Sequence, residues 1–324
     1  MRVLFAASEV FPFSKTGGLA DMGNFLPLSL NKIGHNVTVI TPYYLGISKY
    51  HQSMQFLGEK TVFYGDQKTT VNFFRLEHKG VEVVFVQNQH FFERDRLYGY
   101  DDDDQRFIVF SYAVLEYVDM MNEVPQIIHV NDWQTATIPF LLDEHYRYRS
   151  KYQYIHTLLT IHNLEYQGSF SLDTAKYFNV DFNYTYIHFD AVNYLKTGIE
   201  RATKINTVSP NYRNEIVTSK YGFSLDGSLV KRTADLLGIL NGIDYDIFNP
   251  ETDELIAKNY STRNLKLGKK TNKKAVLEYF GMKNDLDRPL LVYIGRLAKQ
   301  KGINFFEESL ETLINTKNFS LVIL

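Results

Sequence analysis

Short apolar runs alternate with longer amphipathic segments along most of the chain. An apolar run over 2–7 opens the sequence, and 19–34 then carries Leu, Phe and Ile at helical spacing and stops at Gly34, a good helix C-cap. A second apolar run over 36–42 ends at Pro42. Strands that are apolar throughout suit a sheet buried on both faces. The strand–loop–helix–strand order therefore predicts a parallel α/β sheet.

The same pattern continues as far as about residue 210. Further strands are predicted at 71–76, 81–86, 126–130, 156–161 and 203–208. Helical spacing lies between them, notably at 106–122 and 134–149. The segment 65–86 alternates as an antiparallel hairpin would, so we expect a hairpin added to an otherwise parallel sheet.

A domain boundary is predicted near 240–250, where Asn-Gly, two Asp and Pro250 form turn chemistry. The polar, Lys-rich stretch 251–275 then indicates a solvated linker and the start of a helix. We therefore expect an N-terminal Rossmann-like domain over 1–245 and a linker with an incomplete second domain over 246–324.

The second domain is predicted to contain a strand at 288–296, a helix at 302–316 and a strand at 319–324. Two strands and one helix cannot cover both faces of a parallel sheet. The expected fold class is thus α/β, with one complete Rossmann-like domain and the start of another, and we expect the sequence to stop inside that second domain.

Composition narrows the classes of function. The 324 residues carry 35 Lys and Arg against 37 Asp and Glu, a formal net charge of −2, which gives no global attraction to nucleic acid or anionic membrane. A 44% hydrophobic content excludes disorder as the overall state. The chain has no Cys, hence no disulfide, thiolate nucleophile or Cys-based zinc site. Neither a secretory signal nor a run of ~18 apolar residues is present, so a soluble, cytoplasmic protein is expected.

The first candidate motif, KTGGLAD over 15–21, lies between the first strand and the first helix. Gly17 and Gly18 allow backbone N–H groups to approach a ligand, the helix N-terminus favours an anion, and Lys15 adds a positive charge. The motif matches neither a Walker A loop nor G-x-G-x-x-G. Alone, a tight turn with a surface lysine is an equally good interpretation. Its place at the carboxyl end of a parallel strand is where α/β sheets bind ligands.

Two further motifs follow predicted strands. HVNDWQT over 129–135 contains Asp132, which could cap the next helix or accept hydrogen bonds from sugar hydroxyls. TIHNLEYQG over 160–168 contains His162, which could donate a hydrogen bond to a substrate oxygen, although a lone His at a strand end is more often structural. Three such motifs at strand ends favour a site.

A fourth motif, YIGRLAKQKG over 293–302, places Arg296 and Lys301 across a strand-to-helix loop. Two cations near a helix N-terminus could clamp a diphosphate, and the alternative is a solvated basic loop. The four acids over 101–104 are interpreted as a solvated loop rather than a metal site, because a metal needs convergent ligands from several segments.

These motifs together resemble bacterial glycogen synthase and plant starch synthase. The resemblance rests on ordered blocks that span nearly the whole chain: SKTGGLADM (14–22), FFERDRLYG (91–99), HVNDWQT (129–135), TIHNLEYQG (160–168), NTVSPNYRNEI (206–216), LNGIDYDIFNP (240–250) and GRLAKQKG (295–302). Any one block is weak, but their order makes chance negligible.

The resemblance implies a GT-B fold, in which two Rossmann-like domains form a cleft that contains the active site. It also implies that the N-terminal domain binds the acceptor and that the second domain binds the nucleotide sugar. It implies glucosyl transfer from ADP-glucose to the non-reducing end of an α-1,4-glucan such as glycogen, with retention at the anomeric carbon and with no metal or other cofactor. The partners implied are thus the sugar donor and the glucan; no nucleic acid or membrane is expected, and the sequence does not give the oligomeric state.

Residue roles are implied in the same way. Lys15, with Gly17 and Gly18 in its motif, would lie near the donor phosphates and the acceptor, and Asp21 near the adenosine. Asn241 would lie in the donor cleft. By the same resemblance, the transferred glucose would be held by Asp132 and His162, and the departing diphosphate neutralised by Arg296 and Lys301. Stabilising charge on the leaving group lowers the barrier to transfer.

The sequence also departs from the family pattern. The family's E-P-x-G-L block, and the Thr-Gly-Gly loop that lies near it in the second domain, do not occur in these 324 residues, whose one Thr-Gly-Gly run (16–18) belongs to the first motif. We therefore expect the parent protein to be the synthase and this chain to have little or no turnover. The alternatives are a non-catalytic glucan-binding or partner-binding homologue, and a synthase that uses UDP-glucose.

Overall fold

The computed structural model describes residues 1–180, 185–295, 297, 301–303, 310, 312, 315 and 319–324. The chain divides into two compact units, Met1–Gly242 and Ile243–Leu324. The first unit contains a large sheet and a small three-stranded sheet, and the second unit contains a two-stranded sheet.

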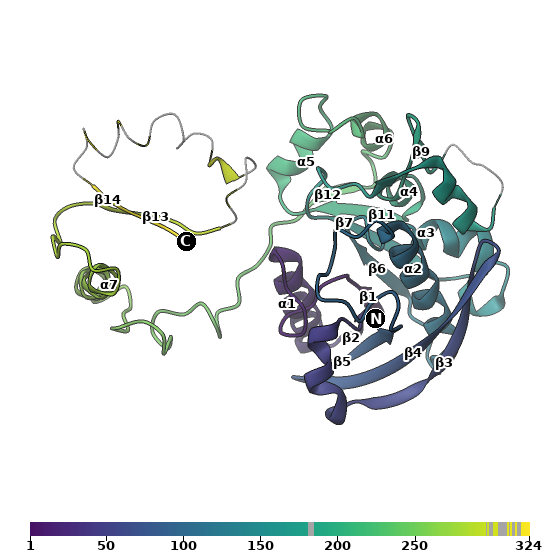
Figure 1. Cartoon of the computed structure of the whole chain (residues 1–324), viewed down its shortest axis with the longest axis horizontal. Helices are drawn as coiled ribbons and strands as arrows, with labels where there is room; N and C mark the ends of the chain where they lie inside the picture. Colours follow the sequence, from purple (N-terminus) through teal and green to yellow (C-terminus); the bar gives the residue numbers. More distant parts are fainter. Residues whose placement is uncertain are drawn as a thin grey trace. The chain divides into compact units, whose positions relative to one another are not determined.

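The first unit is built on a nine-stranded sheet with the order β12-β11-β7-β6-β1-β2-β5-β4-β3 (Figure 1). Its strands are β1 (Arg2–Ala6), β2 (Asn36–Pro42), β3 (Gln55–Tyr64), β4 (Gln67–His78), β5 (Val81–Gln87), β6 (Ile127–Asn131), β7 (His156–Ile161), β11 (Lys204–Thr207) and β12 (Leu236–Gly238). All neighbouring pairs are parallel except the two that include β4.

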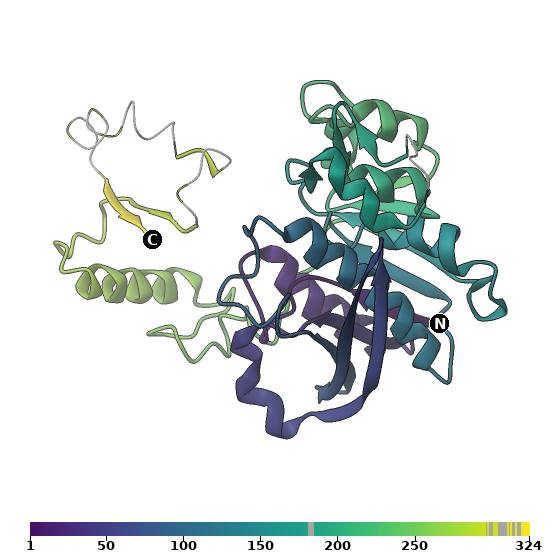
Figure 2. The same ribbon diagram turned by 45° about the vertical axis from the view of Figure 1, so that its right-hand side comes forward.

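Helices cover both faces of this sheet. They are α1 (Gly18–Lys32), α2 (Asp103–Met120), α3 (Ile138–Leu141), α4 (Tyr194–Arg201), α5 (Pro210–Ile216) and α6 (Asp226–Lys231). A small sheet of β8 (Ser169–Phe170), β9 (Ile187–His188) and β10 (Ala191–Asn193) accompanies them. The two helices α1 and α2 lie on opposite faces (Figures 1 and 2).

The apolar sequence of β1 explains why helices must cover both faces of the large sheet. Successive side chains of a strand point to opposite faces. Leu4 and Ala6 join the hydrophobic core under α2, whereas Val3 and Phe5 join the core under α1. An unbroken apolar strand is therefore a central strand of a sheet buried on both sides.

Most predicted elements are confirmed, and two are corrected. The hairpin over 65–86 exists as β4 and β5, but the sequence missed β3, a largely exposed edge strand with a bulge between Phe56 and Gly58. The helix predicted over 134–149 is wrong as a single element. Only Ile138–Leu141 is α-helical, followed by a π-helical stretch at Leu142–Tyr146, because Pro139 cannot donate the hydrogen bond that would extend a helix from 134.

The second unit pairs β13 (Leu290–Tyr293) in parallel with β14 (Ser320–Ile323) and adds α7 (Leu265–Tyr279). Both predicted strands are present. Most of the helix predicted over 302–316 lies outside the described residues.

The acidic run 101–104 is not the solvated loop that was expected. Asp102 forms a two-point ion pair with Arg94, and Asp103 begins α2 as a buried residue. The carboxylate of Asp103 accepts a hydrogen bond from the fully buried Arg106 at 2.5 Å. The i, i+3 spacing of Asp103 and Arg106 on α2 brings the two side chains together. A count of acidic residues in the run does not reveal this pairing.

We predict that Asp103→Ala lowers the free energy of unfolding by about 3 kcal/mol, because the change leaves the buried Arg106 guanidinium without its counterion. Denaturant titration followed by circular dichroism measures this. Asp101→Ala, at an exposed position in the same run, is the matched control and is expected to change stability by less than about 0.5 kcal/mol. Equal losses in the two variants would contradict the prediction.

Candidate active site

Three of the four sequence motifs meet at one edge of the large sheet. The loops that carry Lys15, Asp132 and His162 follow β1, β6 and β7. These strands are adjacent and parallel, in the order β7-β6-β1, so their carboxyl ends lie side by side. Ligands of α/β sheets bind at this edge.

Asp132 and His162 are in direct contact. The Asp132 carboxylate accepts hydrogen bonds from the backbone N–H of His162 at 2.7 Å and of Asn163 at 3.3 Å. Asp132 itself has a positive φ of 52°, an uncommon conformation for a residue other than glycine. Its carboxylate therefore joins two loops and does not cap α3, whose N-cap is Thr137.

Burial raises the pKa of Asp132 above its ordinary value, while His162 and the two N–H donors act in the opposite direction. Because the carboxylate of Asp132 is already held by backbone donors, its orientation is set before any ligand arrives. Such preorganisation is the property that a sugar-binding or charge-stabilising carboxylate needs.

The ring of His162 is oriented by Asn131. The side-chain amide of Asn131 donates to the carbonyl of Ala6 at 3.0 Å, so its oxygen faces the ring and accepts from Nε2 of His162, also at 3.0 Å. The Nε2 proton is thereby used inside the protein. In the neutral ring, Nδ1 is an acceptor, so the neutral His162 would accept a hydrogen bond from a sugar hydroxyl instead of donating one.

The glycine-rich loop is open toward solvent. Gly17 is the N-cap of α1, and a Cβ at Gly17 or Gly18 would have no heavy atom within 4 Å. Packing within the protein thus does not demand glycine at these two positions, and a ligand could approach the backbone there. Lys15 pairs with the carboxylate of Asp21 at 2.6 and 2.9 Å. This half-exposed pair is weak enough for a ligand to separate.

Glu9 is a residue of the site that the sequence reasoning missed. It is only 4% exposed, and its carboxylate accepts hydrogen bonds from the backbone N–H groups of Thr16 and Gly17, the hydroxyl of Thr16 and the hydroxyl of Tyr98. Glu9 therefore holds the loop that presents Lys15. The available signal was a charged residue directly after a buried strand.

Trp133 packs behind the Asp132 loop. Gly168, at φ +61°, lies so close to Trp133 that a Cβ at this position would overlap the indole ring. A cavity of about 380 Å³ opens beside this contact, lined by Tyr100, Asp103, Trp133 and residues 165–170. Glycine in the LEYQG sequence is thus required by packing, and the cavity adjoins the loops of the candidate site.

The remaining predicted residues, Asn241, Arg296 and Lys301, do not belong to the three loops described above. Asn241 is exposed at the end of the first unit, and no hydrogen bond of its side chain is recorded among the described residues. Lys301 is exposed in the second unit, and Arg296 lies outside the described residues. Their roles stay predictions.

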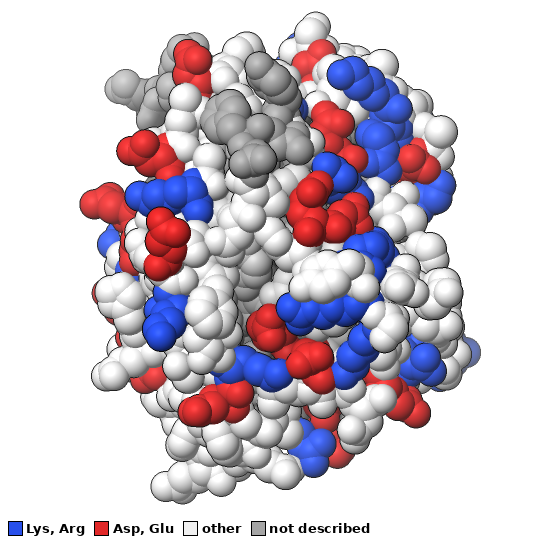
Figure 3. Space-filling view, turned by 90° about the vertical axis from the view of Figure 1, so that its right-hand side faces the viewer, with Lys and Arg blue, Asp and Glu red and all other residues white. Residues whose placement is uncertain are grey.

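Acidic and basic side chains are intermingled on the face drawn in Figure 3, so neither sign of charge dominates that face. In the part of the chain that the structure describes, no group of three or more His, Asp or Glu side chains is placed to hold a metal ion. None of the helices described is long and apolar enough to cross a membrane.

Comparison with known proteins places the chain in a family. Residues 2–231 match the family model of the starch synthase catalytic domain. The chain is 57% identical to glycogen synthase of Acholeplasma laidlawii over its whole length and covers 68% of that protein. The chain belongs to the glycogen and starch synthase family. It is also 42% identical to glycogen synthase of Exiguobacterium sibiricum and covers 67% of it, so it spans about two thirds of these relatives.

A solved structure gives the same result for the fold. The catalytic domain of starch synthase IV from Arabidopsis thaliana, bound to ADP and acarbose, matches with a TM-score of 0.88 and 30% identity, over 100% of this chain and 68% of that one. The expected GT-B-like α/β class is thereby confirmed. The glycogen and starch synthases of this family are glucosyltransferases, so the chain belongs to an enzyme family.

We predict that Glu9→Ala speeds hydrogen exchange at the Thr16 and Gly17 amides of this synthase chain by about tenfold or more, because each loses a charged hydrogen-bond acceptor. Exchange monitored by nuclear magnetic resonance or by mass spectrometry of segment 14–19 measures the change. Glu77→Ala, at an exposed position on β4, is the control and is expected to leave these amides unchanged. Unaltered exchange in Glu9→Ala would show that the loop is held by other contacts.

A second network lies beneath the site. Nε2 of the buried His129 lies 2.6 Å from the Thr160 hydroxyl, which in turn donates to Asn206 at 2.7 Å. Burial, with a smaller contribution from His162, lowers the pKa of His129 to about 3. At a pH between about 3 and 6.5, where 6.5 is the ordinary pKa of histidine, the unfolded chain binds a proton at His129 and the folded chain does not. Stability contributed by neutral His129 is therefore complete above pH 6.5 and is lost as pH falls toward 3.

We predict that His129→Gln reduces the pH dependence of stability between pH 6 and pH 4 by about 1.4 kcal/mol per pH unit, the value for one proton. Denaturant titrations across this range measure the slope. Asp132, whose raised pKa acts with the opposite sign, is present in both proteins and cancels in the comparison. His156→Gln, at an exposed histidine, should keep the wild-type slope. A wild-type slope in His129→Gln would refute this assignment.

Proposed function

We propose that this chain carries the acceptor-binding half of a glycogen synthase that transfers glucose from ADP-glucose to the non-reducing end of an α-1,4-glucan, with retention at the anomeric carbon. The observation that carries the proposal is the contact of Asp132 with the His162 loop beside the open glycine-rich loop, at the carboxyl edge of one sheet. Family membership supports the same reading, and the starch synthase relative was solved with ADP and acarbose bound.

Each side chain has a role in this proposal. The bond between the anomeric carbon and the diphosphate oxygen breaks, a bond to the acceptor 4-oxygen forms, and the acceptor proton leaves with the diphosphate. Lys15 faces the donor phosphates, with Arg296 and Lys301 neutralising the departing diphosphate. Nδ1 of His162 accepts a hydrogen bond from a hydroxyl of the transferred glucose, and Asp132 holds the loop that carries His162.

The choice between ADP-glucose and UDP-glucose depends on which nucleotide base the donor site accepts. The KTGGLAD form of the loop and the ADP in the starch synthase relative favour ADP-glucose. In this proposal Asp21 lies near the adenosine and Asn241 in the donor cleft. UDP-glucose is the alternative donor, and competition by free ADP against free UDP separates the two.

We further propose that the 324-residue chain alone has little turnover. The sequence lacks the E-P-x-G-L block and the second-domain Thr-Gly-Gly loop that the family resemblance associates with donor binding. A non-catalytic glucan-binding role is the second candidate, favoured by the same absence. The two candidates differ in one respect that can be measured, which is donor turnover.

We predict that the purified chain binds glycogen and maltotriose but transfers almost no glucose to them from radiolabelled ADP-glucose. His162→Ala should weaken the binding of ADP-glucose by about tenfold, because it removes a hydrogen-bond partner of the transferred glucose. His156→Ala, at an exposed position away from the carboxyl edge, is the control. Family-like turnover by this chain would overturn the proposed inactivity, and unchanged binding of ADP-glucose in His162→Ala would overturn the proposed role of His162.

A further inference from the structure

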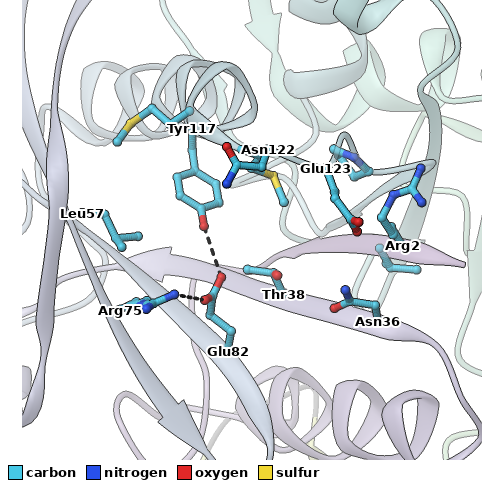
Figure 4. Close-up of a pocket in the computed structure, with 13 residues that line it drawn as sticks. Arg2, Asn36, Thr38, Leu57, Arg75, Glu82, Tyr117, Asn122 and Glu123 are labelled. Carbon is cyan, nitrogen blue, oxygen red and sulfur yellow. Dashed lines mark hydrogen bonds and ion pairs between the residues drawn. The ribbon is translucent and has the colours of Figure 1, made fainter.

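A second cavity lies at the opposite edge of the large sheet. It encloses about 400 Å³ among the first residues of β1, β2 and β5 and the loop that follows α2 (Figure 4). β1 has five residues, so at about 3.3 Å per residue this cavity is roughly 17 Å from the carboxyl edge. One sugar ring cannot reach both, so the cavity is not part of the candidate active site.

The cavity has an ordered polar floor. Glu82 accepts hydrogen bonds from the Tyr117 hydroxyl at 3.3 Å and from Arg75 at 3.1 Å, and Arg75 also donates to Gln55 at 2.8 Å. Figure 4 shows Tyr117 and Arg75 converging on Glu82 from two sides. Burial and Glu82 together raise the pKa of Tyr117, so its hydroxyl stays a donor at physiological pH. The floor is therefore arranged without any ligand.

Around this floor lie polar side chains whose hydrogen-bond donors and acceptors are available to a ligand. Arg2 is fixed by its Nε, which donates to the carbonyl of Val124 at 2.8 Å. Among the residues that the structure describes, no partner is recorded for the terminal nitrogens of Arg2 or for the side chains of Asn36, Asn122 and Glu123, all of which line the cavity. These groups can bind a ligand without breaking an internal bond.

The charges that line the cavity balance. Arg2 and Arg75 lie at opposite ends in Figure 4, and Glu82 and Glu123 face the space between them. A phosphate would meet two carboxylates and a cation would meet two guanidinium groups, so a neutral ligand is favoured over either. Planar arginine, carboxylate and amide groups suit ligands with neighbouring hydroxyls, because each can make two hydrogen bonds at once.

Two further features indicate a sugar of more than one ring. The side chains of Met120, Met121 and Leu57 give the cavity an apolar wall, against which the C–H face of a pyranose can pack. A neighbouring cavity of about 460 Å³ shares Asn36, Arg75 and Glu82 with the first. The shared residues extend the available space along the sheet edge.

We propose that this cavity is a second saccharide site, which takes a neutral pyranose chain with neighbouring hydroxyls, either a free short maltooligosaccharide or the outer end of a glucan branch. The inference rests on the proposed function only for the source of the sugar. A site at this edge would hold the polymer while the carboxyl edge acts on another chain end, which raises the effective concentration of acceptor ends.

The methionine methyl groups allow a direct test on the whole chain. Of the six methionines, Met120 and Met121 line the cavity, and Met22 lies in α1 beside the carboxyl edge. Methyl-labelled protein is titrated with maltose, with maltotriose and, separately, with inorganic phosphate, and signals are assigned by single Met→Leu variants. We expect maltotriose to shift the Met120 and Met121 signals saturably, in the millimolar range, and phosphate to leave them in place.

Two variants locate the binding groups. Glu123→Gln and Asn36→Ala should each weaken the Met120 and Met121 response by about tenfold and leave the Met22 response unchanged. Glu59→Gln, at an exposed carboxylate on β3, is the matched control. Circular dichroism and thermal unfolding verify that each variant is folded.

The outcomes separate this proposal from the proposed function. A maltotriose response at Met22 alone overturns the second site and leaves the proposed function standing. A response at Met120 and Met121 alone supports the second site and removes support from the acceptor site at the carboxyl edge. A response to phosphate but not to maltotriose, or no response at any of the three methionines, overturns the saccharide assignment. Soluble maltotriose and glycogen as competing ligands then distinguish free oligosaccharide from a branch end.

Discussion

Parallel pairing of β7, β6 and β1 determines where the chemistry of this protein can be. In the register of these strands, Val130 lies opposite Ala6 on one side and Leu159 on the other, so the three strands end at nearly the same level. The loops that follow are then close enough for Asp132 to accept hydrogen bonds from the next loop along the sheet. A different strand order would separate these residues, whatever their sequence motifs.

Burial of polar groups is the cost of that arrangement, and the network around the loops offsets it. Glu9, His129 and Asn131 are all almost completely buried, and each has hydrogen-bond partners of its own. Buried polar groups without partners would destabilise the fold, whereas a satisfied network fixes one geometry. The tautomer of His162 and the position of the Lys15 loop follow from this network, and the site is therefore largely preorganised in the first unit.

The two edges of the sheet differ in the polar groups they leave available. At the carboxyl edge the acidic groups hold loops by accepting backbone N–H donors, which leaves Gly18 and the Lys15–Asp21 pair facing solvent. At the amino edge two arginines and two carboxylates surround a cavity of balanced charge. The first arrangement suits a ligand with phosphates, and the second suits a neutral one.

The amino-acid sequence by itself determined the α/β class, nearly all central strands and the family, because unbroken apolar runs and glycine-rich turns are local signals, and the family blocks stand in a fixed order. It could not locate β3, whose solvent-facing side gives only a weak pattern, or the broken helix at Pro139. It also missed Glu9 and the buried Asp103–Arg106 pair, and it did not indicate that Asn131 accepts a hydrogen bond from Nε2 of His162. These features depend on which groups face each other across loops and strands far apart in the chain, and only the tertiary structure decides which hydrogen-bond partner a buried polar group finds.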